Sequence, residues 1–325
     1  MRPAPAVHLR PLRRQPPRPT RGVQGLALAL GLAVSVGAGM LGCAHQRAAV
    51  RVRTYPAPTA AELVARLATR QADLASMNAR VRATSWLGGD RVRATVLMLV
   101  ERTGKLRLEA QVSLQGTVAV LATDGERFAL LDVGHNELRR GPACPRNVAA
   151  LIRIALAPAE VAALLLGDVR IPEPAASADP AHQARVAWDA ELGGDVLVVP
   201  RLDGWLRVVF AAPPGPGPDS NGASIGGTPV ASAILAVIAT GPDGAPRWRA
   251  RFEDFVAASF SPRSPATGRG AVPVPQIIRY AEGSSSFDDG VEIKFKERVY
   301  DESAPADSFS IVPTPGVTAV EVGCH

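Results

Sequence analysis

The chain has 325 residues, 47% of them hydrophobic and 20% charged, which is enough for one large domain or two small ones with a buried core. Its formal net charge of +6 comes from residues 1–42, which hold six of the 36 bases and no acid. The remaining bases equal the 30 acids, so the folded part lacks the basic footprint of a nucleic-acid-binding protein, and we expect no nucleic-acid partner.

The N-terminus has the pattern of a secretory signal. Residues 1–24 are rich in arginine, and residues 25–42 (GLALALGLAVSVGAGMLG) form an apolar run that ends in small residues. The run is also long enough to span a bilayer, so a single transmembrane anchor is the alternative. Residues 40–43 (MLGC) resemble the lipobox of bacterial lipoproteins, in which the cysteine is lipidated and becomes the N-terminus after cleavage. We therefore predict a signal peptide over 1–42, an acylated (palmitate-type) Cys43, and a polar tether over 43–58.

Lipid on Cys43 would anchor the protein without a spanning helix, because each buried methylene contributes about 0.8 kcal/mol. Ala44 follows the cysteine in place of aspartate, which, by resemblance to enteric sorting rules, favours the outer membrane. We thus expect a lipid-anchored protein that faces the periplasm, with membrane lipids as its partners through Cys43.

The other two cysteines, Cys144 and Cys324, would then lie in an oxidising compartment, where an even pair is typical of a disulfide. Two unpaired thiols are the alternative, since the sequence does not show whether the two residues are close. A zinc site with His325 has no support from ligand spacing. We therefore predict a disulfide and no metal site.

The first element expected after the tether is an amphipathic helix over 58–78. Thr59 and Glu62 have capping-box spacing. The stripe that follows has helical periodicity. It consists of Leu63, Val64, Leu67, Leu74 and Met77.

The hydrophobic period then changes to two. In residues 105–112 (KLRLEAQV), apolar and polar side chains alternate, which predicts a half-buried antiparallel strand. Two helices follow over 144–156 and 158–167, each with a proline in its first turn, and the second is apolar almost all round, so it should be buried. Residues 213–229 are rich in proline and glycine, and we assign them no structure. Further strands are expected over 92–100, 117–123, 127–133, 184–192, 195–202, 204–212, 231–240, 247–255, 275–282 and 291–300.

This order predicts one antiparallel, strongly curved sheet wrapped on a few helices. Together with the leader, it resembles the LolA/LolB family of periplasmic lipoprotein carriers and outer-membrane lipoprotein receptors. Residues 106–132 resemble the receptor's early strands, residues 147–168 its helical segment, and residues 275–317 its last strands. The resemblance implies an α+β fold over 59–325, an incomplete antiparallel β-barrel (half-barrel) covered by helices. It also implies a cavity for acyl chains of lipoproteins or lipids, with a periplasmic LolA-like carrier as a candidate partner.

The resemblance also suggests site residues. In LolB-type receptors a leucine protrudes from the early hairpin loop and assists insertion into the bilayer, and Leu114 occupies that place here. The alternative is that Leu114 belongs to the core at the barrel mouth. From alternation, the residues expected to line the cavity, with ordinary core as the alternative, are Leu106, Leu108, Ala110, Val118, Val120, Ile293 and Phe295.

Enzymatic function has little support in the sequence. Residues 222–226 (GASIG) match the GxSxG pattern of hydrolases, but the proline-rich residues before Ser224 are incompatible with the central strand that this motif requires. His135 and His182 lie in expected turns without a nucleophile beside them. We therefore predict a protein without catalysis or cofactor that accepts lipoproteins or lipids at the outer membrane. The alternative is a structural or signalling lipoprotein without catalysis that uses the same fold to bind a protein partner or to sense the state of the envelope.

Overall fold

The structure, a computed structural model, describes residues 51–87, 90–171, 183–213, 224–225, 228–229, 233–264, 271–302, 304–305, 307–313 and 315–324. They belong to a unit that spans residues 47–325. The predicted signal peptide and Cys43 lie outside the described residues. None of the helices in this described part is long and apolar enough to cross a membrane.

The described chain contains three α-helices, α1 (Ala60–Asp73), α2 (Pro145–Ile152) and α3 (Pro158–Leu165), and a 3₁₀ turn, η2 (Phe287–Asp289). Its strands are β1 (Ser76–Leu87), β2 (Asp90–Glu101), β3 (Leu106–Val112), β4 (Gly116–Thr123), β5 (Arg127–Asp132), β6 (Glu137–Pro142), β7 (Arg185–Asp189), β8 (Gly194–Arg201), β9 (Gly204–Ala211), β10 (Ser224–Ile225), β11 (Thr228–Pro229), β12 (Ile234–Thr240), β13 (Pro246–Ala257), β14 (Pro273–Glu282), β15 (Val291–Tyr300) and β16 (Thr318–Glu321).

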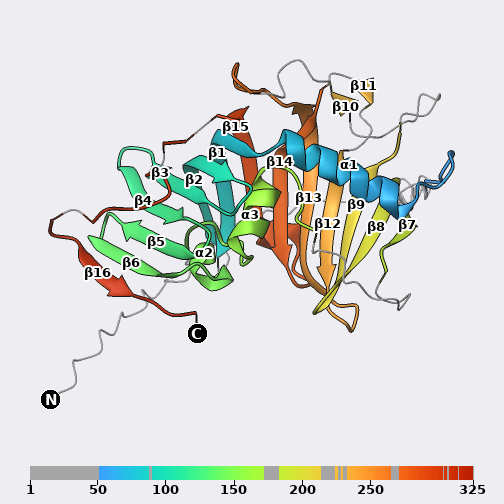
Figure 1. The fold of residues 1–325 in the computed structure, drawn as a ribbon. Coiled ribbons are helices and arrows are strands. Elements are labelled where there is room, and N and C mark those ends of the chain that lie inside the picture. Colours follow the sequence, from blue (N-terminus) through green and yellow to red (C-terminus); the bar gives the residue numbers. More distant parts are fainter. Residues whose placement is uncertain are drawn as a thin grey trace, which may run out of the picture. The chain divides into compact units, whose positions relative to one another are not determined.

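Most of the described strands form one sheet. Its order is β16-β6-β5-β4-β3-β2-β1-β15-β14-β13-β12-β9-β8-β7. Neighbouring strands are antiparallel, except that β16 runs parallel to β6. The early and late parts of the chain meet in the middle, where β1 pairs with β15 and Met77 lies opposite Tyr300. The predicted α+β class with a large antiparallel sheet is confirmed, and Figure 1 shows α1 lying across the strands.

The core follows the sequence pattern closely. On β3, Leu106, Leu108 and Ala110 are buried, while the residues between them are partly exposed, because successive strand side chains point to opposite faces. The apolar side chains of all three helices join those of one sheet face in a single cluster. Helix α3 is buried, as its composition predicts.

Helix α1 begins as expected and ends early. The backbone N–H of Glu62 donates to Thr59 Oγ1 at 3.2 Å, and that of Thr59 donates to Glu62 Oε2 at 2.7 Å, which completes the capping box. The helix ends at Asp73, however, and Met77 belongs to β1. Met77 fits the helical period, but its burial comes from pairing with strands more than twenty residues away, so the sequence prediction of a helix to residue 78 was wrong.

Strands β6 and β16 were not predicted from the sequence. Strand β6 (ELRRGP) is short and polar, and β16 is exposed along its length. These two strands pair with each other although they are far apart in the chain. A window of neighbouring residues carries no signal for such a pairing. In the segment 213–229, for which we expected no structure, the described residues of β10 and β11 pair with each other.

The described end of the predicted tether is bound to the sheet edge. The backbone N–H of Arg51 donates to Ala190 O at 3.0 Å, and Trp188 Nε1 donates to Arg51 O at 2.8 Å. Arg53 Nη2 lies 2.8 Å from Asp195 Oδ1, and the Tyr55 hydroxyl donates to Asp195 Oδ2 at 2.7 Å. Asp195 is fully buried, so these contacts satisfy its charge. They fasten the segment before α1 to β7 and β8.

A disulfide joins Cys144 to Cys324, with a Cα–Cα distance of 6.1 Å. Cys144 precedes α2, and Cys324 follows β16. The backbone N–H of Val322 also donates to Arg140 O at 2.8 Å. The C-terminal segment is therefore held by the ladder to β6 and by the disulfide to the start of α2.

Candidate binding pocket

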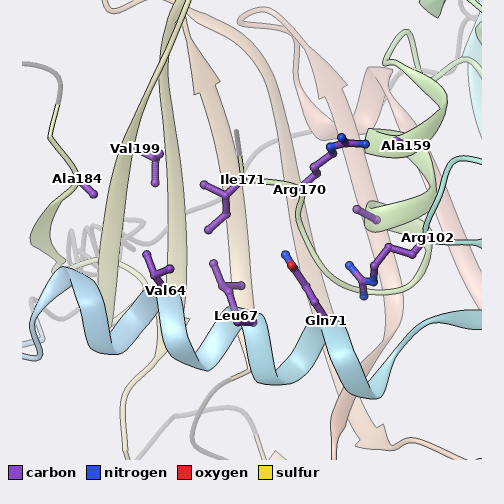
Figure 2. Close-up of a pocket in the computed structure, with 11 residues that line it drawn as sticks. Val64, Leu67, Gln71, Arg102, Ala159, Arg170, Ile171, Ala184 and Val199 are labelled. Atoms are coloured by element: carbon purple, nitrogen blue, oxygen red, sulfur yellow. The ribbon is translucent and has the colours of Figure 1, made fainter. Parts of the chain in front are cut away.

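A pocket of about 420 Å³ lies between α1, α3 and β8. This volume falls within the range of about 300–1,000 Å³ that is typical of small-ligand sites. Figure 2 shows side chains of α1 on one side of the pocket and the α3 region on another. The lining residues are Val64, Leu67, Ala68, Gln71, Arg102, Ala159, Ala163, Arg170, Ile171, Ala184 and Val199.

Helix α1 supplies one wall through residues 64, 67, 68 and 71. This spacing places the four side chains on one helix face. Leu67 is fully buried, whereas Val64 is 41% exposed. An apolar side chain so exposed on the core-facing part of a helix indicates that the sheet and the other helices leave it uncovered. The wall is therefore apolar and accessible from outside.

Helix α3 faces this wall with small side chains. Ala159 and Ala163 are four residues apart and lie on the same helix face. Because an alanine side chain ends at Cβ, Ala159 and Ala163 leave space between α3 and α1. Val199 of β8 and Ala184, just before β7, complete the apolar end of the pocket.

Arg102 at the polar end is fixed by its partners. Its Nε and Nη2 donate to Leu74 O at 3.1 Å and 2.7 Å, and its Nη1 lies 2.9 Å from Asp168 Oδ2. Asp168 is fully buried and also accepts a bond from the backbone N–H of Val169 at 2.8 Å. Burial raises the pKa of Asp168, and the neighbouring guanidinium groups of Arg70 and Arg102 oppose this rise.

The end of α3 is tied to α1 by another arginine, Arg70, which is buried. Arg70 donates through Nη1 to Pro273 O at 2.6 Å and through Nη2 to Gly167 O at 2.7 Å. Gly167 has a φ of +78°, and a Cβ there would lie 2.5 Å from Cδ of Pro275, so only glycine fits this helix end. Gln71 Nε2 adds a bond to Val169 O at 3.0 Å. These bonds set the position of the chain that leads to Arg170 and Ile171.

The residues predicted to line a cavity are not among those around this pocket. Six of the seven are buried in the sheet, and Val118 is half-buried. A cavity lined by these residues stays a prediction. The six are Leu106, Leu108, Ala110, Val120, Ile293 and Phe295.

Leu114 lies on the tight turn between β3 and β4. Its side chain is completely exposed, with a relative accessibility of 107%, and its φ is +75°. The N–H of Gln115 donates to Val112 O at 3.2 Å and closes the turn. The alternative that Leu114 is core at a barrel mouth therefore does not hold in this structure, and a role at the membrane stays a prediction.

Sequence reasoning missed the pocket because its walls come from separate segments. The α1 stripe was visible as a hydrophobic period, and the small residues of α3 were visible as a buried helix. Nothing in the sequence indicated that Arg170, Ile171 and Val199 would lie beside them.

The structure describes only some of the residues considered for catalysis. Ser224 lies in β10, which pairs with β11, while its glycine neighbours and His182 lie outside the described residues. His135 is exposed, and its Nδ1 lies 2.9 Å from Asp132 Oδ2 within one turn. Among the described residues, no group of three or more His, Cys, Asp or Glu side chains is placed to hold a metal ion.

No protein-family model and no curated protein matches the sequence. The fold is similar to a LolA superfamily protein from Nitrosomonas europaea, with a TM-score of 0.46 and 10% identity over 78% of this chain and 99% of that one. It is also similar to a domain described as an outer membrane lipoprotein-sorting protein from Vibrio parahaemolyticus, with a TM-score of 0.44 and 10% identity over 77% and 97%. At this low similarity these structures carry no argument about the site, which depends on its own geometry.

Proposed function

We propose that this protein is a lipid-anchored outer-membrane lipoprotein that takes acyl chains of lipoproteins or lipids into the pocket between α1, α3 and β8. The observation that carries the proposal is the apolar end of this pocket, which is lined by Val64, Leu67 and Val199 and open at the exposed side chain of Val64. An apolar surface of this kind is favoured to leave water when an acyl chain covers it.

The proposed architecture is a half-barrel whose helices cover its inner face. It is supported by the single apolar cluster that α1, α2 and α3 share with one face of the sheet. A half-closed sheet of this kind does not fill its interior with side chains alone, so a lipid can occupy the remaining space.

The proposed anchor is lipid on Cys43. Only a short stretch of chain separates Cys43 from Arg51, which is bound to the sheet edge beside β7. Because a residue spans at most about 3.6 Å, this stretch holds the β7 edge within about 30 Å of the bilayer surface. The proposed action is transfer of acyl chains between apolar sites, without a covalent step and with a LolA-like carrier as a candidate donor.

Blocking the pocket tests this proposal. Ala184 lines the pocket and is exposed, so Ala184→Trp should fill the opening without disturbing the core. Ala187→Trp, at a nearby exposed position on β7 outside the lining, is the matched control. Excluding about four methylenes costs about 3 kcal/mol, which is about a hundredfold in affinity.

The measurement is crosslinking of a photoreactive diacylated peptide to the full-length protein in membrane vesicles. We expect labelling to fall at least tenfold in the Ala184→Trp variant and to be unchanged in the Ala187→Trp variant. Equal labelling of both would refute binding in this pocket and favour the alternative of a lipoprotein that binds a protein partner. Mass spectrometry of the protein extracted from membranes should find an acylated N-terminal Cys43, and an intact leader would refute the anchor.

A further inference from the structure

The pocket has two chemically different ends. In Figure 2, Val199 and Ala184 lie at one end, and Arg102 and Arg170 lie at the other. Among the described residues of the lining, Gln71 is the only other polar side chain, and none is an aspartate or a glutamate. A ligand that fits this lining has an apolar part and a group that accepts hydrogen bonds from guanidinium.

The two arginines differ in how far their charge is already satisfied. Arg102 makes bonds to Leu74 and Asp168, as described above, and has little capacity left. Arg170 is exposed, and among the described residues it has no ion-pair or hydrogen-bond partner. The buried acid nearest this end, Asp168, faces Arg102 and is shielded from solvent.

Arg170 also borders a second hollow, of about 430 Å³, which adjoins the first pocket at Ala159. The other arginine of that hollow, Arg201, is neutralised by Glu160 at 2.8 Å and by Asp203 at 3.4 Å. Among the described residues, no acid neutralises the positive charge of Arg170 at the opening that the two hollows share.

We propose that the preferred ligand is an amphiphile with one acyl chain and an anionic head, a carboxylate or a phosphate. The chain occupies the apolar end by Val64 and Val199, and the head lies against Arg170, with the already paired Arg102 beside it. The volume of about 420 Å³ is near the lower limit for small-ligand sites and suits one chain better than several. This inference rests on the proposed acyl-chain function and adds the charge of the head.

The experiment compares two photoreactive probes on the full-length protein in membrane vesicles: a diazirine derivative of palmitate, and its methyl ester, which has the same chain without the charge. The variants are Arg170→Glu and Arg170→Lys, with Arg93→Glu as a control that makes the same charge change at an exposed position on β2 outside the pocket. Because the exposed Arg170 side chain makes no hydrogen bond or ion pair with the described residues, its variants should melt at the same temperature as the parent protein.

We expect labelling by the palmitate probe to fall about tenfold in the Arg170→Glu variant, because the new carboxylate repels the anionic head. Labelling should change less than threefold in the Arg170→Lys variant, which keeps the positive charge. It should be unchanged in the Arg93→Glu variant. The methyl ester should label all variants equally. Equal labelling by both probes, unaffected by Arg170→Glu, would refute the anionic head but leave acyl binding intact. If neither probe labels the pocket, the proposed function itself fails.

Competition identifies the anion. Displacement of the palmitate probe by unlabelled palmitate alone assigns a carboxylate, displacement by lysophosphatidate alone assigns a phosphate, and displacement by both assigns either head. Displacement by a cationic amphiphile, hexadecyltrimethylammonium, as strong as by palmitate would contradict the proposal.

Discussion

Loss of the Cys144–Cys324 disulfide should lower the stability of the protein substantially. The bond closes a loop with a sequence separation of 180 residues, which includes α2, α3 and every strand from β7 to β16. In the chain-entropy account, releasing a loop of this length lowers the free energy of unfolding by about 5 kcal/mol at 25 °C, because the unfolded chain gains freedom. Measured losses for native disulfides are about 2–5 kcal/mol. We therefore expect a loss of about 3–5 kcal/mol.

The native state should tolerate the change, because β16 is exposed and contributes little to the core. The perturbation is the double variant Cys144→Ser/Cys324→Ser, followed by tryptophan fluorescence in urea. Both the double variant and its reference protein carry Cys43→Ser, so that neither is lipidated at this position and the two differ only in the disulfide. The free energy of unfolding should fall more steeply with urea concentration in the double variant, because its unfolded state is more expanded.

If the double variant loses less than about 1 kcal/mol in its free energy of unfolding, and this free energy has the same slope against urea concentration, the reasoning is refuted, because the typical effect is several times larger. It would mean that the C-terminal segment already moves freely in the native protein. The ladder bond from Val322 to Arg140 would then not hold in solution.

Gly204 has a φ of +141°, and a Cβ there would lie 1.9 Å from Thr240 O, so Gly204→Ala should destabilise the β8–β9 turn by more than about 3 kcal/mol. Gly244→Ala, at a φ of +79° with open space around it, should cost only about 1–2 kcal/mol, and equal melting temperatures for the two variants would contradict the clash. Leu114→Glu should leave the melting temperature unchanged, because the side chain is fully exposed, and should reduce delivery of lipoproteins to vesicles at least fivefold. Gln115→Glu adds the same charge to the same turn and should have a smaller effect; equal effects would indicate simple repulsion from the bilayer.

Several features of this protein follow from the sequence alone. Alternation in residues 105–112 and 291–300 predicts strands, because side chains on successive residues of a strand point to opposite faces. The apolar composition of residues 158–167 predicts a buried helix, and the spacing of Thr59 and Glu62 predicts where α1 begins. These signals are local, since each depends on residues within one element.

The tertiary structure decided what depends on distant segments. Leu74 and Met77 fit the helical stripe of the sequence, although Leu74 lies at the end of α1 and Met77 lies in β1. Only the pairing of β1 with β2 and β15 excludes the longer helix. The parallel pairing of β6 with β16, and the bonding of Arg53 to Asp195, join parts of the chain that share no local pattern.

The pocket is the clearest case of this division. The hydrophobic period of α1 predicts its apolar wall. The opposite wall consists of Ala159 and Ala163. Their small size leaves space only because α3 packs opposite α1, which the sequence does not show. Arg170 is one arginine among many in the sequence, and only the folded structure shows that none of the described acids neutralises it. Burial and charge balance are properties of the folded surroundings, so residue type and spacing alone do not determine them.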